Sequence, residues 1–390
     1  MALPSDERNR SSCIRDNYLV YEIKSMERAT FERLVERLRG GEQMAASPFE
    51  VPAALYQSRE QLEAERPLFA LPRIATLSSA IPAGGVAPYD EAGLSAILAR
   101  GQDGVLRAFA NACRHRATRL VDAPCAAKAM VCPYHGWTYD LAGTLIHAPH
   151  ASMFGAACEK RDLRPISVAE RDGLVWIGGE QIREHLGGLD ADLRALRFDD
   201  HVVWRTATVT RRCNWKLVIE AFLDGYHIRV LHRDSIYRFF LDAMSLAEPV
   251  GPHIRAISAR RTLREAPTSL DGVELRLLAT PSFTVFPATT IIAHPDFISI
   301  IVLSPTSAGT TEWRHTMVVP ASRAGDAEHW DKSWELIEGS VFQREDLWVC
   351  EQIQRGLESG TDDPLLFGAL ETPIAWFHAA IEARATPSMT

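Results

Sequence analysis

The sequence predicts an α+β protein: a small all-β domain joined to a larger domain in which helices pack on an antiparallel sheet, a helix-grip arrangement. Three observations predict this class. With 390 residues, the chain has room for two domains or for one large domain with an insertion. Between residues 69 and 180, apolar runs are short and broken by Gly and Pro. After about residue 200, longer β-type runs are accompanied by helical patterns.

Two helices are predicted ahead of the β domain. Residues 26–40 repeat apolar side chains at the i, i+3, i+4 and i+7 spacing of an amphipathic helix: Phe31, Leu34, Val35 and Leu38. This pattern stops at Gly40-Gly41, a glycine C-cap. A second helix should begin at Ser58, with Gln61 as its capping-box partner, and should end near Pro67. We expect residues 1–68 to form a helical segment that packs on the larger domain.

The remaining chain is predicted to form the two domains. Runs such as "VLRAFAN" and "GLVWIGG" predict small sheets in a domain of residues 69–180. In a domain of residues 181–390, five runs separated by Pro, Gly and Asp predict strands: "IRAISARRTL" (254–263), "SFTVF", "TTIIAH", "ISIIVLS" and "WRHTMVV". A long helical pattern then extends from Ala327 to Ser359.

Charge and composition argue against several classes of protein. The formal net charge is -8 and no long Lys/Arg run occurs, which argues against nucleic acid or an anionic membrane surface as the main partner. No apolar run approaches the roughly 20 residues that span a bilayer. The N-terminus, "MALPSDERNRSSCIRD", lacks the apolar stretch of a signal peptide, so we expect a cytoplasmic protein. Seven Cys, an odd number, favour metal ligation over a disulfide framework.

Two short pairs, Cys113-x-His115 and Cys132-x-x-His135, can hold a metal centre between two loops. A tetrahedral zinc site is one alternative, and four buried polar residues without a metal is another. Zinc fingers, however, usually pair Cys with Cys and His with His. Mixed pairs let both Cys bind one iron and both His the other, which is the ligand arrangement of a Rieske [2Fe-2S] cluster.

The same segment resembles the Rieske domain in its wider motif. The matching residues are Arg116 after the first pair, Cys132-Pro-Tyr-His135-Gly-Trp137, Tyr139-Asp140 and Gly143. Arg114 stands where many relatives carry Pro, between two ligands that it should leave unchanged. Cys125 has no matching partner in the intervening loop, so the disulfide of respiratory-chain Rieske proteins is not evident.

A second group of metal-binding residue types lies in "NWKLVIEAFLDGYHIRVLHRD", residues 214–234. If residues 215–230 are helical, Asp224 and His227 share a face. His232 then lies about 140° from that face, so both His meet only if the helix bends, bulges or ends between them. Taken alone, two His residues are equally compatible with core or surface roles.

This segment resembles the iron-site segment of the Rieske non-haem iron oxygenase α subunits, in which Asn-Trp-Lys leads to Glu and then Asp-x-x-His-x4-His. The resemblance implies a mononuclear Fe(II) held by His227, His232 and a carboxylate, with one face open to O2 and substrate. In "VFQREDLWVCEQIQRGL", Asp346 is the one charge on a predicted apolar stripe: Phe342, Asp346, Val349, Cys350, Ile353 and Leu357. An ion pair with Arg344 or with a distant Arg is the alternative role for Asp346, and Glu345 falls off the stripe. The resemblance carries the third ligand to Asp346.

The resemblance also implies a role for Asp224 and an assembly. Asp224 would bridge His227 and a cluster His of a neighbouring subunit, with His135 preferred and His115 open. Such a bridge needs a closed head-to-tail ring, most often a homotrimer in the family, and α3β3 is possible. Relatives often carry Asn where this chain has Ala221.

The implied function is a terminal oxygenase that uses O2 and electrons from a separate NAD(P)H reductase, with or without a ferredoxin. The chain has no Gly-rich nucleotide fingerprint of its own. Arg114, Arg116 and Arg119 either dock an acidic ferredoxin or are solvated and locally hydrogen-bonded. An electron-transfer Rieske protein without mononuclear iron and a zinc-binding scaffold remain alternatives.

The substrate pocket is expected to be apolar and aromatic. The predicted lining is "SIYRFFLDAM", Phe283, Phe286, His294 and Phe297, although the same residues suit a plain core. We therefore expect hydroxylation or cis-dihydroxylation of an aromatic or other apolar substrate first. Oxidative N- or O-demethylation, for example of a methylated or quaternary amine held by aromatic rings, is the second expectation.

Overall fold

The protein is described from a computed structural model, which places residues 26–44, 46–179, 181–360 and 363–385. The polar N-terminal stretch considered above lies outside these described residues. Helices and antiparallel sheets both occur, which confirms the predicted α+β class. Across the described ranges, no helix is long and apolar enough to cross a membrane.

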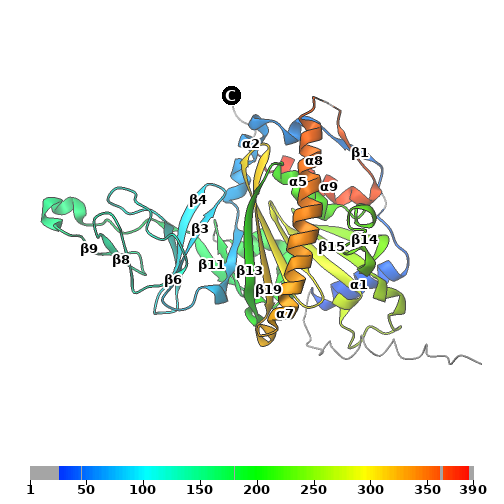
Figure 1. Ribbon diagram of the computed structural model, residues 1–390, viewed down its shortest axis with the longest axis horizontal. Helices are drawn as coiled ribbons and strands as arrows, with labels where there is room; N and C mark the ends of the chain where they lie inside the picture. The colour runs from blue at the N-terminus through cyan, green and yellow to red at the C-terminus, as the bar shows by residue number, and fades with distance from the viewer. Residues whose placement is uncertain (1–25, 45, 180, 361–362, 386–390) are drawn as a thin grey trace, which may run out of the picture.

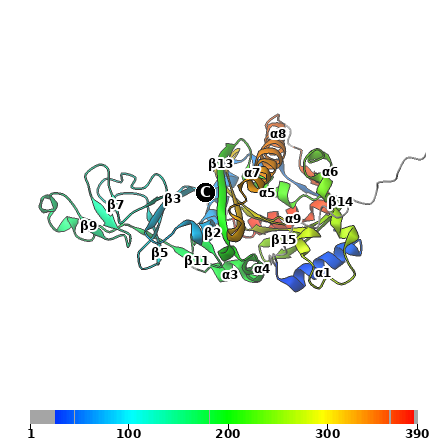
Figure 2. The same ribbon diagram turned by 60° about the horizontal axis from the view of Figure 1, so that its bottom comes forward.

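Three small antiparallel sheets form the part of the molecule that projects to the left in Figures 1 and 2. The first has the order β10-β5-β4-β3-β6, with bounds Pro165–Ile166, Leu106–Ala110, Leu94–Arg100, Gly85–Glu91 and Cys125–Ala126. The second is β7-β8-β9, with bounds Ala129–Val131, Thr138–Asp140 and Leu145–His147. The third is β11-β12-β2, with bounds Val168–Arg171, Leu174–Ile177 and Arg73–Leu77. The chain enters this part along β2 and leaves it along the neighbouring antiparallel strand β12.

A seven-stranded antiparallel sheet dominates the rest of the molecule, in the order β13-β19-β18-β17-β16-β15-β14. The strand bounds are β13 His201–Arg211, β14 Phe240–Val250, β15 His253–Arg260, β16 Ala279–Val285, β17 Thr289–Ala293, β18 Ile298–Ser307 and β19 Thr310–Pro320. The five predicted strands correspond to β15 to β19. The two edge strands, β13 and β14, were not predicted.

Helices cover both faces of this sheet. Their bounds are α1 Arg28–Arg39, α2 Arg59–Glu65, α3 Ile182–Leu186, α4 Asp190–Ala195, α5 Trp215–Leu223, α6 Ile228–Leu231, α7 Ala327–Trp334, α8 Leu347–Leu357 and α9 Thr372–Glu382. One apolar core lies between the sheet and α5, α8 and α9. The other lies between the sheet and α1, α3 and α4. Figure 1 shows α7 and α8 running as one long element beside the sheet.

The two N-terminal helices form where the sequence predicts them. All four apolar residues of α1 are buried, and the helix ends at Gly40. In α2, Ser58 Oγ accepts a hydrogen bond from the Gln61 backbone N–H at 3.1 Å. The Gln61 side chain donates instead to Glu65, so only half of the predicted capping box forms. Strand β1 (Phe49–Val51) pairs with β20 (Leu365–Phe367), which ties this segment to the end of the chain.

The helix near the end of the chain differs from the apolar stripe that the sequence predicted. Between α7 and α8 the chain forms a π-helix, η12 (Glu335–Asp346), whose wider turn shifts side chains away from 3.6-residue spacing. Phe342, Asp346 and Cys350 are buried as predicted. Ile353, however, is 38% exposed, and the next residue, Gln354, is buried in its place. The Gln354 side-chain oxygen accepts a hydrogen bond from the Asn214 backbone N–H at 2.9 Å, which explains that burial.

Candidate metal centres

Helix α5 leads into the second group of metal-binding residues, which includes His227 and His232, and is held rigidly. The Asn214 side chain caps its first turn by accepting from the Lys216 backbone N–H at 2.9 Å. The Lys216 ammonium is fully buried and lies 2.7 Å from the buried Glu65 carboxylate. Trp215 Nε1 donates to the other oxygen of Glu65. The helix is therefore fixed to α2 by a buried ion pair and a hydrogen bond.

Helix α5 ends before both histidines, so residues 215–230 do not form one continuous helix. Asp224 is the C-cap and has extended backbone angles. The following Gly225 approaches Ser245 so closely that a Cβ atom at position 225 would lie 3.1 Å from the Ser245 side chain. This turn, followed by the single turn α6, brings His227 and His232 together. The helix therefore ends ahead of both histidines rather than between them, and the separate turn α6 lies between the two residues along the chain.

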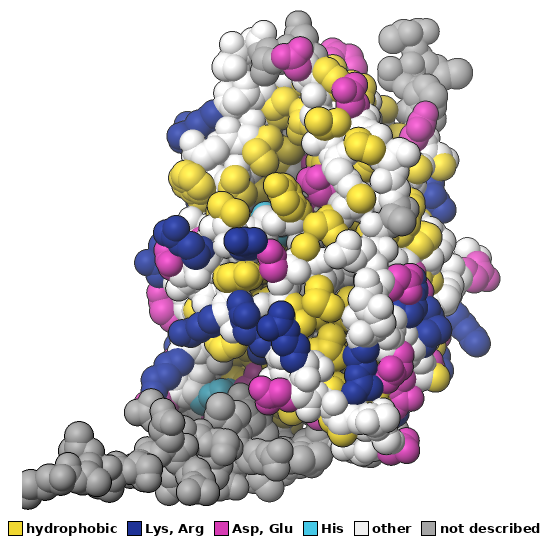
Figure 3. Space-filling view, turned by 90° about the vertical axis from the view of Figure 1, so that its right-hand side faces the viewer, with side chains coloured by type: hydrophobic (Ala, Val, Ile, Leu, Met, Phe, Trp, Pro, Cys, Tyr) yellow, Lys and Arg dark blue, Asp and Glu magenta, His cyan; other side chains and the backbone are white. Residues whose placement is uncertain are grey.

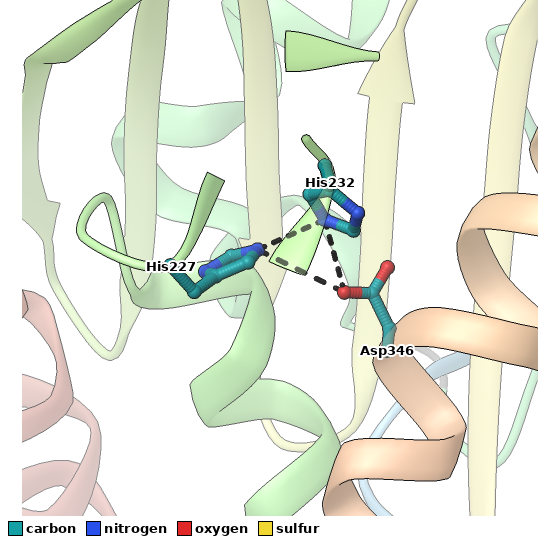
Figure 4. A group of neighbouring side chains, drawn as sticks. All are labelled: His227, His232 and Asp346. Carbon is teal, nitrogen blue, oxygen red and sulfur yellow. Dashed lines mark hydrogen bonds and ion pairs between the residues drawn. The ribbon is translucent and has the colours of Figure 1, made fainter. Parts of the chain in front are cut away.

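His227, His232 and Asp346 converge on one point (Figure 4). Nε2 of His227 lies 3.1 Å from Nε2 of His232. Oδ1 of Asp346 lies 3.2 Å from the His232 nitrogen and 3.8 Å from the His227 nitrogen. Ligand atoms bonded at about 2.1 Å and at right angles to one metal would be about 3.0 Å apart. The arrangement is that of a two-histidine, one-carboxylate face.

The polar atoms at this point fit a cation. Oδ1 of Asp346 is buried and accepts no hydrogen bond, a costly state for a carboxylate oxygen unless a metal binds it. Burial disfavours a charged His232, yet Asp346 and Glu345 outweigh it and raise the pKa of His232 to about 9. The site therefore attracts positive charge, and a metal would replace that proton. The ion pair of Asp346 with Arg344 does not form, because Arg344 binds Glu335, Ser340 and the Gly339 carbonyl.

Glu345 is a site residue that the sequence analysis missed. Its Oε2 lies 2.8 Å from Nδ1 of His232 and also accepts from Ser235 Oγ at 2.7 Å. It thus orients the His232 ring so that Nε2 faces His227 and Asp346. Regular helical spacing had placed Glu345 off the buried stripe, whereas the π-helix turns both Glu345 and Asp346 toward the histidines. Its position next to Asp346 was the only signal in the sequence.

Asp224 lies behind His227. Its Oδ2 is 3.2 Å from Nδ1 of His227, although the two groups are not aligned as a hydrogen bond. Two cavities flank these residues, and Ala221, Asp224 and His227 line both of them. We call the one that also has Asp346 in its wall the inner cavity, and the one that Val230 lines the outer cavity. A carboxylate at this place can orient His227 and couple it to a group arriving from the outer cavity.

The inner cavity has a volume of about 300 Å³ and includes both histidines and Asp346 in its wall. Ile236, Phe239 and Phe240, all from the predicted "SIYRFFLDAM" segment, line it, as do His294 and Phe297. Phe283 and Phe286 do not: both are buried in the two apolar cores, which corrects their predicted place in the pocket. Polar side chains on one face of β15 and β16 complete the wall: Ser258, Arg260, Thr280 and Ser282.

The outer cavity opens on a face with many exposed apolar side chains. Tyr226, Val230, Trp348 and Leu366 are all more than half exposed. Figure 3 views the molecule from the side of β1 and β14 and shows hydrophobic side chains gathered over its upper half, with a histidine visible in a hollow among them. Apolar patches of this kind mark contacts with other molecules.

The first group of predicted ligands also lies together, on the loops of the projecting part. Cys113 and Cys132 are buried in the same apolar cluster. The His115 ring stacks on Trp137, and its centroid is 4.7 Å from that of the exposed His135. Nδ1 of His115 is buried and has no hydrogen-bond partner, which fits a bond to a metal.

The electrostatics at these loops fit thiolate and neutral imidazole ligands. Burial disfavours a thiolate at Cys132, but the Tyr134 and His135 backbone N–H groups outweigh it and lower the pKa of Cys132. Desolvation and the neighbouring His135 lower the pKa of His115. Tyr139 Oη lies 3.4 Å from Cys113 Sγ and accepts from a backbone N–H, so its own proton is available to the sulfur. Such hydrogen bonds tune a cluster potential.

The arginines near these loops are largely engaged locally. Arg119 forms ion pairs with Asp90 at 2.5 Å and with Asp122 at 2.8 Å. Arg116 donates to Tyr134 Oη, and Arg114 to the Asp162 carbonyl. These contacts favour local hydrogen bonding for Arg119 in particular. All cysteines within the described ranges, Cys125 among them, have free thiols.

Comparisons with known proteins match both parts of the chain. Residues 74–163 match the family described as Rieske [2Fe-2S] domain. Residues 198–386 match the family described as ring hydroxylating alpha subunit (catalytic domain).

Two curated relatives are similar over most of their length. The carnitine monooxygenase oxygenase subunit of Escherichia coli is 28% identical over 341 residues, which cover 82% of this chain and 87% of that protein. The chloroplastic choline monooxygenase of Arabidopsis thaliana is 26% identical over 311 residues, covering 73% and 70%.

Two solved structures share the fold. A quaternary ammonium Rieske monooxygenase superposes with a TM-score of 0.75 at 21% identity, over 86% of this chain and 95% of that one. Naphthalene 1,2-dioxygenase superposes with a TM-score of 0.72 at 18% identity, over 87% and 93%. The fold is thus shared by enzymes that act on very different molecules.

Proposed function

Because this chain belongs to the Rieske non-haem iron oxygenase α subunits, which carry a [2Fe-2S] cluster and a mononuclear iron, we propose that it is a monooxygenase that removes a methyl group from a methylated or quaternary amine. The observation that carries the proposal is the aromatic cavity on the His227, His232 and Asp346 site. It is supported by the extensive similarity to carnitine and choline monooxygenases. Aromatic hydroxylation, the first expectation from the sequence, becomes the rival.

The cavity suits a cationic methylated nitrogen. Five phenylalanine rings line it: Phe222, Phe239, Phe240, Phe297 and Phe342. A quaternary ammonium cannot donate a hydrogen bond, so ring faces and nearby carboxylates are the groups that can hold it. Asp224 and Asp296 supply negative charge in the same wall. The ammonium would therefore lie among the rings that no guanidinium covers, with its methyl groups toward the metal site.

Arg260 adds an anion-binding group to the same wall. Its guanidinium lies over the rings of Phe239 and Phe240 and donates to Thr280 Oγ1 at 3.2 Å. A guanidinium among hydroxyl groups matches a carboxylate. The substrate we propose is therefore an amine that carries both methyl groups and a carboxylate.

The reaction would use two metal centres, an iron–sulfur cluster and a mononuclear iron. Cys113, His115, Cys132 and His135 would hold the cluster. His227, His232 and Asp346 would hold the iron, which when bound supplies the binding and reduction of O2. The residues around it orient His232 through Glu345, keep the methylated nitrogen among the phenylalanine rings, and exclude bulk water. For each methyl group, one O2, two electrons and two protons give formaldehyde, water and the demethylated amine.

The assembly follows from the place of Asp224. We propose that it relays electrons from a cluster histidine, with His135 preferred because its ring is exposed, on a neighbouring copy docked at the outer cavity. A closed head-to-tail ring, such as a homotrimer, satisfies this contact in every copy. Electrons come from a separate NAD(P)H reductase, directly or through a ferredoxin. We assign residues 69–180 to the cluster domain, 181–390 to the iron domain, and 1–68 to a segment that packs on the latter.

Turnover with matched substrates tests the function. The iron-loaded protein and a surrogate reductase would be supplied with glycine betaine, carnitine, choline and naphthalene, and O2 uptake, formaldehyde and products would be quantified. We expect formaldehyde in equal amount to the O2 consumed, with betaine-type substrates preferred. A cis-diol from naphthalene with no formaldehyde from any amine would replace this function by the aromatic one.

A further inference from the structure

A series of hydrogen-bonded, buried polar side chains starts at the inner cavity and runs from strand to strand of the seven-stranded sheet. His294, which lines the cavity, places Nε2 3.2 Å from Ser299 Oγ on β18. The same hydroxyl lies 3.0 Å from Nε2 of His315 on β19. Nδ1 of His315 then lies 2.8 Å from the Glu338 carboxylate on η12. None of these four residues belongs to the metal site described above.

Each link of the chain has one donor and one acceptor. The Glu338 carboxylate accepts, so Nδ1 of His315 carries its proton and Nε2 is an acceptor. Ser299 Oγ–H therefore donates to His315, and the Ser299 oxygen accepts from Nε2–H of His294. Burial lowers the pKa values of His294 and His315 more than Glu338 raises that of His315, so both rings are neutral. All the donors point the same way, from the cavity toward Glu338.

The chain is held rigidly in an apolar core. Ser299 and His315 are fully buried between strands of the sheet. The His315 ring stacks on Trp334 with an interplanar angle of 4° and meets the edge of Phe342. His294 stacks on Phe297. Burying so many polar groups where apolar residues would pack is costly, and the cost is offset only when every group is paired.

The far end of the chain approaches solvent. Glu338 Oε1 accepts from Gln343 Nε2 at 2.5 Å, and Gln343 in turn accepts from Arg211. Gln343 and Arg211 are both partly exposed. At the cavity end, the charged groups that face His294 are Arg276 and Arg260, both of which favour its neutral form. The chain thus connects the neighbourhood of the surface with the substrate cavity.

We propose that His294, Ser299, His315 and Glu338 form a proton relay out of the substrate cavity. The inference rests on the proposed function, because a hydroxymethyl group on a quaternary nitrogen breaks down to formaldehyde and an amine only when its hydroxyl loses a proton. That proton passes to Nδ1 of His294, whose Nε2 proton moves to the Ser299 oxygen. The Ser299 proton moves to Nε2 of His315, and the Nδ1 proton of His315 moves to the Glu338 carboxylate, which releases it toward solvent. Each transfer breaks one bond to hydrogen and forms another, so neither ring becomes charged.

Substitution of Ser299 tests the relay, with a control on the same strand. Ser299→Ala interrupts the chain without touching the cavity, Ser299→Thr restores a hydroxyl, and Ser304→Ala removes a buried hydroxyl of β18 outside the chain. Pre-reduced, iron-loaded proteins would be mixed with O2 and substrate in a single turnover. General acid–base steps contribute about 10²–10⁴-fold, so we expect Ser299→Ala to slow product formation at least about tenfold, and Ser304→Ala by less than about twofold.

Two further readouts separate a relay from a structural role. The solvent isotope effect on the single turnover should increase in Ser299→Ala and return to the wild-type value in Ser299→Thr. In ¹⁵N spectra of protein with oxidised cluster and no mononuclear iron, His315 should be a neutral tautomer protonated at Nδ1. Thermal unfolding and cluster absorbance confirm that each variant is folded.

The outcomes are decisive. Equal rates for Ser299→Ala and Ser304→Ala, or an unchanged isotope effect, overturn the relay, as does a His315 ring protonated at Nε2. Should Ser299→Thr not fold, the isotope effect in Ser299→Ala decides. Formaldehyde release is followed in the same single turnover. An absence of demethylation in the wild-type protein overturns the proposed function, whereas demethylation at equal rates in Ser299→Ala and Ser304→Ala overturns the relay alone.

Discussion

Glu345 allows a quantitative test of how the iron site is held. Its carboxylate lies 2.8 Å from Nδ1 of His232 and is itself fixed by Ser235. Loss of such an orienting partner typically costs about 10–100-fold in metal affinity, which is about 1.4–2.7 kcal/mol. We therefore expect Glu345→Ala to weaken Fe(II) binding by this amount. Glu345→Gln keeps an acceptor but loses the charge, and since charge-assisted hydrogen bonds are about twice as strong as neutral ones, its loss should lie near the lower end.

The assay is competition between the protein and a chelator under anaerobic conditions, with cluster absorbance as the measure of intact protein. Glu335→Ala is the matched control, because Glu335 lies on the same π-helix, is 71% exposed at its side chain and forms an ion pair with Arg344. Wild-type iron affinity in Glu345→Ala would refute the orienting role, and so would an equal loss in Glu335→Ala.

Four further predictions follow from other contacts. Asp224→Asn should retain both metal centres but slow reduction of the mononuclear iron in stopped-flow experiments, and normal turnover would remove Asp224 from the electron path. Arg260→Gln should raise the KM for a carboxylate-bearing amine by about tenfold or more and leave that for choline unchanged, because a hydrogen bond between charged groups is lost; equal effects on both would exclude Arg260 from carboxylate binding. Lys216→Ala should lower the free energy of unfolding, measured in urea, by about 3–5 kcal/mol, because Glu65 is left buried and unpaired, whereas Lys216→Met with Glu65→Gln should cost less. In iron-depleted protein, the pKa of His232 is raised from 6.5 to about 9, so its protonated form stabilises the fold below pH 6.5. That contribution, up to about 3 kcal/mol, should be lost as the pH rises through 9, and a pH slope that persists in His232→Gln would contradict it.

The sequence predicted well what depends on local pattern. The mixed Cys/His pairs lie close together because each pair is fixed within a few residues. The strands β15 to β19 follow apolar runs between turn residues. Helix α1 buries the four residues that its periodicity selected.

It predicted less well what depends on distant packing. The end of α5 at Asp224 is set by the close approach of Gly225 to Ser245, some twenty residues away. The role of Glu345 depends on a π-helix, which a 3.6-residue period cannot anticipate. Phe283 and Phe286 have the composition of a pocket wall, but Phe283 points to the face of β16 opposite to that of Ser282, and Phe286 follows the strand; both are buried in the apolar cores. The relay joins residues from β18, β19, η12 and the loop after β17, and has no local signature at all.

The pairing of β2 with β12 has a practical consequence for protein engineering. The cluster-bearing part begins at β2 and ends at β12, and these two strands are adjacent. The segment between them can therefore be exchanged between relatives as one cassette. The iron-bearing half does not begin where the cassette ends. Its helix α5 needs Glu65, and its Glu220 needs the Tyr56 hydroxyl, both from residues ahead of the cassette. Expression from residue 181 onward would therefore discard part of the fold, whereas a fragment that joins residues before β2 to residues after β12 through a short linker would keep it.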